Sequence, residues 1–214
     1  MDKLDFKKEY KDLYLPKTFP ATVDVPEMTF IAVDGKGDPN TEGGEYQQAI
    51  QALYALTYAI KMSKMGDQKP EGYFEYVVPP LEGFWQIEGD AEFDAAQKDK
   101  FVWTSVIRQP EFVDQKVFDW ACGQITSKKP EIDISKARLM TFTEGLCVQC
   151  MHVGSYDSEP ATIAKINEFI GQNGFAGDFS QERRHHEIYL GDPRKVEEDK
   201  RRTVIRHPIK RAAL

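Results

Sequence analysis

The residues most able to do chemistry lie in one short segment near the C-terminal end of the sequence. The pattern of residues 185–190 predicts a β-strand. One face of this strand would carry His185, Glu187 and Tyr189. The opposite face would carry His186, Ile188 and Leu190. The second set is expected to pack under a helix, which leaves Glu187 and Tyr189 together on the other face. A carboxylate beside a phenol can accept a proton and donate a hydrogen bond, as general acid–base catalysis requires. A solvated strand face carries the same residue types, so the segment alone leaves both interpretations open.

Aromatic side chains elsewhere in the chain could complete a binding site around Glu187. The candidates for this role, with two histidines, are Tyr76, Phe84, Trp85, Trp103, Tyr156, His152 and His185. Any one of these aromatic residues could equally be part of the core. Several of them around one acid would form a flat apolar slot with a single polar anchor, which suits a planar, lipophilic and often cationic ligand. Burial in such a slot predicts a raised pKa for Glu187, which would let it act as a general base.

Three motifs that could bind a metal or a cofactor are better explained as parts of the fold. Cys147 and Cys150 would point to opposite faces of a strand, so they cannot bind one ion together and are expected to be buried structural thiols. Gly35-x-Gly37 lacks the third glycine of a dinucleotide fingerprint, and His185-His186-Glu187 lacks the second histidine of a zinc protease. We therefore expect no metal and no cofactor.

Composition excludes several broad classes of protein. The chain has 214 residues, of which 41% are hydrophobic and 29% charged, which is typical of a globular protein. Its net charge of −7 argues against nucleic-acid binding, and its apolar stretches are too short to span a membrane. The charged start of the sequence is unlike a secretory signal, and three cysteines do not suggest a disulfide framework. We expect a cytoplasmic protein, and the sequence leaves its oligomeric state open.

The elements that would position these residues follow one order twice. The second half is predicted as a strand, a helix and two further strands, at 146–153, 158–171, 186–190 and 203–206. The first half has the same order with one more strand, at 28–33, 44–65, 73–78, 81–87 and 100–108. A short helix near 6–13, a helix over 114–127 and a strand-like connector at 139–142 lie outside this order. Val106-Ile107-Arg108-Gln109-Pro110 matches Val204-Ile205-Arg206-His207-Pro208 at four positions of five.

This order predicts an α+β fold of two pseudo-symmetric repeats, whose antiparallel sheets form a central ligand cleft. Residues 1–27 would be a lead-in, 28–135 the first repeat with a helical insertion, and 136–214 the second repeat, together forming one domain. Glu75 and Glu187 would occupy matching positions. The first repeat would supply the stacking wall and the second the acid.

Four segments of the sequence resemble the stand-alone GyrI-like small-molecule-binding proteins. They are Val25–Phe30, Asp34–Asn40, Pro80–Trp85 and His186–Arg194, and the likeness extends from about Leu4 to Pro208. In related drug-sensing transcription regulators this fold is the effector domain that binds lipophilic cations, and a buried glutamate matching Glu187 is their counter-charge. The helix-turn-helix of those regulators has no counterpart in residues 1–27, so we do not expect a transcriptional role.

The resemblance implies one of two functions. Some stand-alone members hydrolyse cyclopropane-containing genotoxic natural products, which implies a detoxifying hydrolase here. Glu187 would then deprotonate water, and Tyr189 or Tyr156 would donate a hydrogen bond to the oxygen that gains charge. The alternative is a non-catalytic multidrug-binding or sequestering protein. Direct interaction with DNA or gyrase is a third and weaker alternative.

Overall fold

Most strands of the protein belong to one closed antiparallel sheet. The computed structural model describes residues 3–66, 69–89 and 97–212. The strands run in the order β4-β1-β3-β2-β6-β7, and a β4–β7 pairing closes them into a six-stranded barrel, with β5 added to β7. Their bounds are β1 Ala21–Lys36, β2 Leu81–Ile87, β3 Phe101–Arg108, β4 Ala137–Val153, β5 Phe175–Gly177, β6 His185–Tyr189 and β7 Arg202–Arg211. The prediction of an α+β fold is confirmed, but one closed sheet replaces the separate sheets that we expected, and the pseudo-symmetry stays a prediction.

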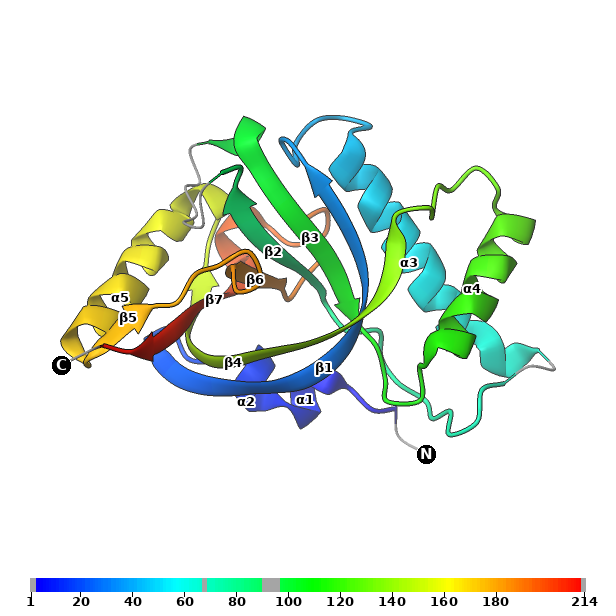
Figure 1. Ribbon diagram of the computed structural model, residues 1–214, viewed down its shortest axis with the longest axis horizontal. Helices are drawn as coiled ribbons and strands as arrows, with labels where there is room; N and C mark the ends of the chain where they lie inside the picture. Colours follow the sequence, from blue (N-terminus) through cyan, green and yellow to red (C-terminus); the bar gives the residue numbers. More distant parts are fainter. Residues whose placement is uncertain (1–2, 67–68, 90–96, 213–214) are drawn as a thin grey trace.

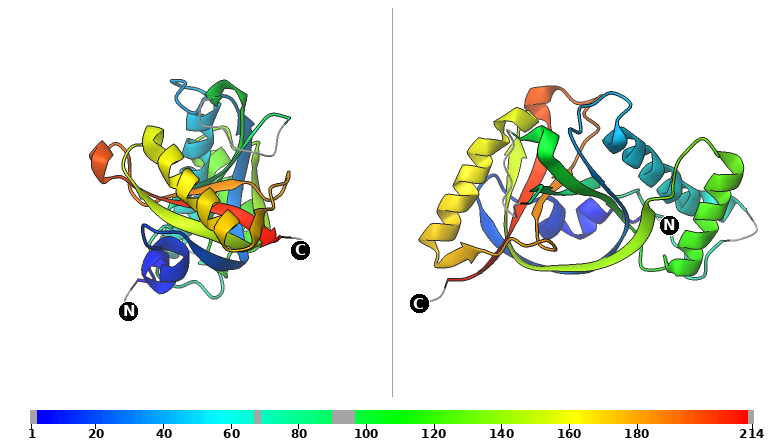
Figure 2. Two further views of the ribbon diagram at one scale, coloured as in Figure 1. Left: turned by 90° about the vertical axis from the view of Figure 1, so that its left-hand side faces the viewer. Right: turned by 45° about the horizontal axis from the view of Figure 1, so that its top comes forward.

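Helices cover the barrel on three sides (Figures 1 and 2). They are α1 Phe6–Glu9, α2 Lys11–Tyr14, α3 Glu45–Met62, α4 Gln115–Lys128 and α5 Glu159–Gln172, with short 3-10 turns at Ser63–Met65, Lys98–Lys100, Tyr156–Ser158 and Glu198–Lys200. The apolar stripe of α3, including Leu53, packs with α4 over Ile31 and Trp103 of β1 and β3. Helix α5 covers β4 and β7 through a smaller cluster around Ile166. The helices predicted from periodicity are thus confirmed to within a few residues.

Strands β1 and β4 bend together at one point. Their ladder runs over residues 21–25 and 27–33 of β1, and Pro26 is left out because proline has no N–H to donate. Glu144 of β4 lies opposite this gap, and its side chain is buried inside the barrel. The sequence analysis placed the start of the first strand at residue 28 and a separate connector at 139–142. Both were wrong, because the bend is contained within continuous strands.

The strand predicted for residues 73–78 is also wrong. This segment makes only a single parallel bridge, between Tyr76 and Leu4, and the two prolines that follow it precede β2. Glu75 therefore does not occupy a position matching Glu187. It is instead paired with Lys64 of the 3-10 turn that follows α3.

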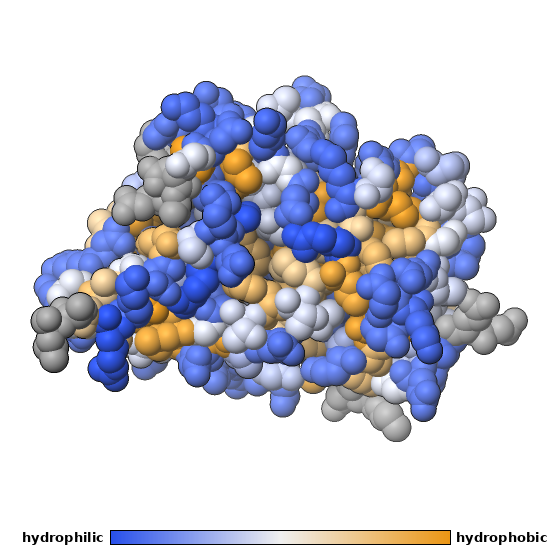
Figure 3. All heavy atoms as spheres, viewed as in Figure 1, coloured by the Kyte–Doolittle hydropathy of each residue, from blue (hydrophilic) through white to orange (hydrophobic). Residues whose placement is uncertain are grey.

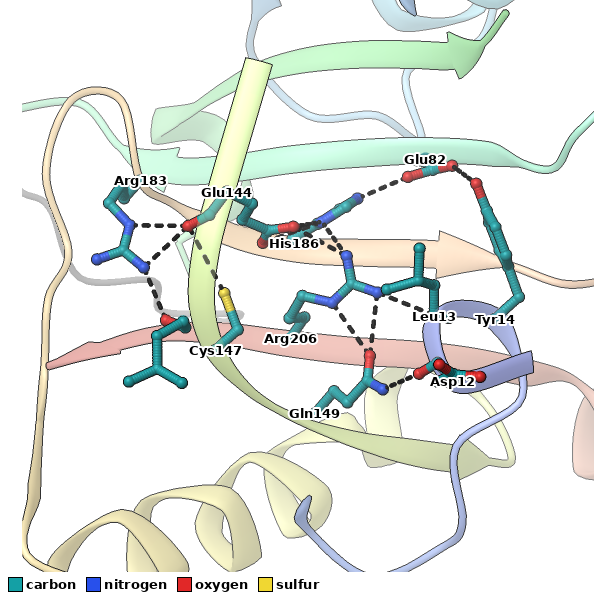
Figure 4. A network of polar contacts seen from close by, with 11 residues as sticks. Asp12, Leu13, Tyr14, Glu82, Glu144, Cys147, Gln149, Arg183, His186 and Arg206 are labelled. Carbon is teal, nitrogen blue, oxygen red and sulfur yellow. Dashed lines mark hydrogen bonds and ion pairs between the residues drawn. The ribbon is translucent and has the colours of Figure 1, made fainter. Parts of the chain in front are cut away.

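The interior of the barrel contains a buried network of ionisable side chains (Figure 4). His186 lies between Glu82 and Glu144, with Nε2 3.0 Å from one carboxylate and Nδ1 3.0 Å from the other. Arg206 donates to Glu144 through Nη1 at 2.8 Å and to Gln149 through Nε at 3.1 Å. Each charge in this network therefore has an opposite partner, as burial requires.

The same network fixes the N-terminal helices to the barrel. Nη2 of Arg206 donates to the backbone carbonyl of Leu13 at 2.9 Å, and the hydroxyl of Tyr14 donates to Glu82 at 3.3 Å. Phe6, Leu13 and Tyr14 pack against interior residues of the strands in one apolar cluster.

Polar and charged residues cover most of the face seen in Figure 3, with apolar residues showing between them over the sheet.

Candidate functional site

The outer face of β2, β3 and β6, between α3 and α5, brings together most of the predicted site residues. Trp103 is paired with Trp85 across β3 and β2, and Trp85 with His185 across β2 and β6. Residues that are paired in this way point to the same side of a sheet. Glu187 is paired with Gly83, so its side chain lies on the same face as both tryptophans. The predicted sharing of one face by His185, Glu187 and Tyr189 is confirmed.

Glu187 is the centre of a chain of hydrogen bonds. Its Oε1 lies 2.8 Å from Nε2 of His185, and its Oε2 accepts from the hydroxyl of Tyr189 at 2.7 Å. The indole Nε1 of Trp85 donates to the same hydroxyl at 3.0 Å. Nδ1 of His185 lies 2.8 Å from Nε2 of His207, which is also buried. These contacts fix the carboxylate and supply it with two directed donors.

Two glycines make room for the tryptophans. A Cβ at Gly83 would lie 2.5 Å from the indole Nε1 of Trp85, and one at Gly35 would lie 2.2 Å from the indole of Trp103. Both indoles therefore lie against a strand where a larger residue would displace them. In this arrangement Trp85 and Tyr189 cover Glu187. Two open depressions on the surface lie away from Glu187, and one of them borders Gly35.

Two tyrosines complete the aromatic surroundings. Tyr46 of α3 contacts the rings of Trp85 and Trp103, with centroids 5.4 and 5.1 Å apart. Tyr156 meets Tyr189 edge to face at 5.8 Å. The sequence analysis named Tyr156 but missed Tyr46, which belongs to a helical stripe that reads as ordinary core.

A second acid, which the sequence analysis also missed, lies beside Glu187. Glu159 is the first residue of α5, is 4% exposed, and lies close enough to Glu187 and to Thr203 of β7 for both to act on its ionisation. Burial and the charge of Glu187 raise the pKa of Glu159 well above its usual range. Because Glu159 precedes a proline at a helix start, its sequence context suggests only a solvent-exposed first turn.

The expected direction of the Glu187 pKa is wrong. Burial does oppose its ionisation, but hydrogen bonds from His185, Tyr189 and Glu159 outweigh burial, and the pKa lies below its usual value. Glu187 is therefore the ionised member of the pair. The carboxyl with the raised pKa is Glu159.

Two predicted ligand-binding residues lie on the interior side of the sheet, and a third, His152, shares the outer face with Tyr189 but contacts the start of α5. Phe84 is paired with His186 on the interior face and stacks on its ring at 4.1 Å, because strand alternation turns it away from Trp85. Tyr76 packs near α1 in the same interior cluster. The ring nitrogens of His152 contact Thr162 and the Ser155–Ser158 turn, so this residue holds the start of α5 in place.

The cysteine motif has a structural place. Cys147 faces the barrel interior and Cys150 faces α5, as alternation predicted, and both are buried. Among residues 3–66, 69–89 and 97–212, no group of three histidine, cysteine, aspartate or glutamate side chains is placed to hold a metal ion. No helix in this part of the chain is long and apolar enough to cross a membrane.

Known structures share this architecture. A structure from Listeria innocua described as an uncharacterized conserved protein is 50% identical, with a TM-score of 0.92, over 97% of this chain and 100% of its own. Another from the same organism, described as a hydrolase, is 47% identical with a TM-score of 0.88 over the same shares. The C-terminal domain of EcmrR is 12% identical over 90% of this chain and 98% of its own, and its TM-score of 0.54 indicates a likeness of fold alone. No curated protein matches the chain significantly.

The sequence model of one domain family agrees with this likeness. The GyrI-like small molecule binding domain matches residues 19–210, which include strands β1 to β6, β7 up to residue 210, and the residues around Glu187. The predicted resemblance is confirmed: the chain belongs to the GyrI-like family of small-molecule binding domains.

Proposed function

We propose that the chain binds planar hydrophobic or cationic small molecules between α3 and α5 and hydrolyses those that carry a strained, cyclopropane-type electrophile. The observation that carries this proposal is an ionised, buried glutamate enclosed by tryptophan and tyrosine rings. Aromatic rings attract flat ligands by stacking, and the carboxylate supplies the only full charge that they surround. Two relatives described as hydrolases, each 47% identical, support the catalytic part.

Binding requires a rearrangement of the aromatic cover. Trp85 lies over Gly83 and is hydrogen-bonded to Tyr189, so its indole occupies space beside Glu187. A flat ligand would take this space when the indole rotates outward, and would stack between Trp85 and Trp103. Once the indole has rotated away, the small residue at position 83 would leave the carboxylate accessible from that side.

The reaction would add water across the strained carbon–carbon bond. Glu187 accepts a hydrogen bond from the water and takes its proton as the new carbon–oxygen bond forms. The electron pair of the breaking bond passes to a conjugated oxygen of the substrate, and the proton that Glu187 took from water reaches that oxygen through solvent, which restores the carboxylate. Tyr156 suits the role of hydrogen-bond donor to this oxygen, because burial raises its pKa to about 12 and it keeps its proton while the charge develops. Tyr189 already donates to Glu187.

Turnover by the variant Glu187→Gln tests this proposal. With a spiro-cyclopropyl dienone in large excess over protein, the wild type should form many equivalents of the hydrated product. The variant should lose at least about 100-fold in rate, because glutamine cannot take the proton. Glu75→Gln, the same change at a glutamate paired with Lys64 far from this face, should retain full rate. Product limited to one equivalent, or an unchanged rate in Glu187→Gln, would contradict the catalytic role.

A second candidate function is binding without catalysis. The lowered pKa of Glu187 favours it, since a weakly basic carboxylate is a better counter-charge than a base. In that case lipophilic cations would bind stoichiometrically, Glu187→Gln would weaken their binding, and no product would form.

A further inference from the structure

Glu159 and Glu187 form a pair of buried carboxyls contributed by different elements. Glu159 begins α5 and Glu187 is central in β6, and they are 4% and 6% exposed. The two carboxyls lie close enough for the charge of Glu187 to act directly on the ionisation of Glu159. Two carboxylates in contact and shielded from water cannot both be ionised without a strong repulsion, so such a pair retains a proton.

The donors around the pair show which member holds that proton. Each oxygen of Glu187 has its own donor, from His185 and from Tyr189. Glu159 lies beside the hydroxyl of Thr203, and its buried Oε1 has no hydrogen-bond partner among the described residues. An ionised Glu159 would leave that oxygen unsatisfied, whereas a protonated Glu159 donates to Glu187. The geometry therefore places the proton on Glu159.

No cationic side chain neutralises the pair. Throughout the described ranges, neither carboxyl forms an ion pair with a lysine or an arginine. The other titratable or charged groups facing the pair are Tyr46 from α3, Tyr156 and Asp157 from the turn before α5, His185 and Tyr189 from β6, and Arg201, whose guanidinium lies 5.5 Å from the ring of Tyr156. Apart from His185, already bound to Glu187, the groups that contact the carboxyls are neutral or acidic.

We propose that Glu159 is a specificity-determining residue of this site, and that an organic cation binds by replacing the proton which Glu159 shares with Glu187. This inference rests on the proposed binding function. It adds that the site distinguishes cationic from neutral ligands by whether the proton on Glu159 is released. A bound cation supplies the positive charge that allows both carboxyls to ionise, and the proton passes to solvent. A neutral ligand of the same shape leaves the proton in place.

Proton release measured by isothermal titration calorimetry tests this inference. N-methylacridinium, a flat permanent cation, is titrated at pH 7 in phosphate and in Tris buffer, whose heats of ionisation differ. The wild type should release about one proton per cation bound, and binding should tighten up to about tenfold per pH unit. Acridine, which is uncharged at this pH, should release none.

Two variants distinguish the carboxyl pair from other sources of protons. Glu159→Gln should still bind N-methylacridinium, with no proton release and no dependence of its affinity on pH around neutrality. Glu168→Gln, a change at an exposed carboxyl farther along α5, should behave as the wild type. The infrared carbonyl band of a protonated carboxyl should be present in the unliganded wild type, disappear when the cation binds, and be absent from Glu159→Gln.

The outcomes separate the two proposals. Cation binding without proton release, or equal release by Glu159→Gln, would overturn the proton exchange and leave the proposed binding function intact. Failure of the wild type to bind either acridine compound would overturn both.

Discussion

Single glycines decide where the tryptophans of the candidate site lie. The indole of Trp103 rests on Gly35 across the β1–β3 pair, and that of Trp85 lies over Gly83 on its own strand. Neither backbone position has the positive φ that demands glycine. The need for glycine comes from the rings alone, which require the space that a Cβ would fill.

Replacing Gly35 with alanine should therefore move Trp103. The new Cβ would lie 2.2 Å from the ring, so the indole must shift out of a fully buried position. We expect a loss of about 1–3 kcal/mol in the free energy of unfolding, measured in urea, with a change in tryptophan fluorescence. Gly123→Ala on the exposed side of α4, where nothing lies within 4 Å, should be stabilising by about 0.5–1 kcal/mol. Equal effects of the two changes would contradict the steric argument.

Glu187 and Glu159 show how much of the candidate site could be predicted from the sequence. Strand alternation was enough to place Glu187 with Tyr189 and His185, because a period of two fixes the face of every residue. It could not reveal Glu159, because the contact between α5 and β6 depends on how a helix is positioned over the sheet. It also gave the wrong direction for the Glu187 pKa, since the hydrogen bonds that lower it involve the ring positions of a histidine and a tyrosine.

At the scale of elements, α1 and α2 depend on one arginine. Arg206 of β7 holds the carbonyl of Leu13 and the side chains of Gln149 and Glu144 at once. Neither helix is long enough to be stable alone, so their order comes from these contacts and from the apolar cluster. The sequence predicted a helix near residues 6–13, but nothing in it linked that helix to a residue almost 200 positions later.

Arg206→Lys should loosen these helices selectively. Lysine keeps the charge beside Glu144 but lacks the planar group that reaches Gln149 and Leu13 together. We expect a loss of about 2–4 kcal/mol in stability and faster hydrogen exchange of the backbone amides of α1 and α2. Arg194→Lys, at an exposed ion pair with Asp192, should change stability by less than about 0.5 kcal/mol. Unchanged exchange in α1 and α2 would show that other contacts anchor them.

The order of elements was largely predictable, and the closure of the sheet was not. Proline positions and apolar runs located most strands, including β2 after the double proline. The β4–β7 pairing and the bend at Pro26 depend on contacts distant in sequence, so local patterns carry no signal for them. Residues 73–78 have the composition of a strand, but find no partner strand along their length.

At the scale of the whole molecule, the buried network makes stability depend on pH. Burial opposes the ionisation of Glu144, but His186 and Arg206 outweigh it and lower the pKa of Glu144 from 4.5 to about 2. This contribution is complete above pH 4.5 and is lost as the pH falls toward 2. Burial also disfavours the charged form of His186, yet Glu144 and Glu82 raise its pKa above 6.5. That contribution is complete below pH 6.5 and is lost as the pH rises through the raised value.

The difference in the free energy of unfolding between the wild type and Glu144→Gln should therefore depend on pH, and it should be largest between pH 4.5 and 6.5. We expect the variant to be less stable by about 3–5 kcal/mol between pH 4.5 and 6.5, because it leaves Arg206 without its carboxylate partner and His186 with Glu82 alone. The difference should shrink toward pH 2, where the wild-type carboxyl is itself protonated. Urea unfolding across this range measures it. A difference independent of pH would show that packing, not charge, accounts for the effect.

The most direct test of the account is a crystal structure of the protein with N-methylacridinium bound. We predict density for the flat ring beside Glu187, between α3 and α5, with the indole of Trp85 rotated away from Gly83 and stacked on the dye. Density only in another part of the molecule, with Trp85 still bonded to Tyr189, would contradict the assignment of this site.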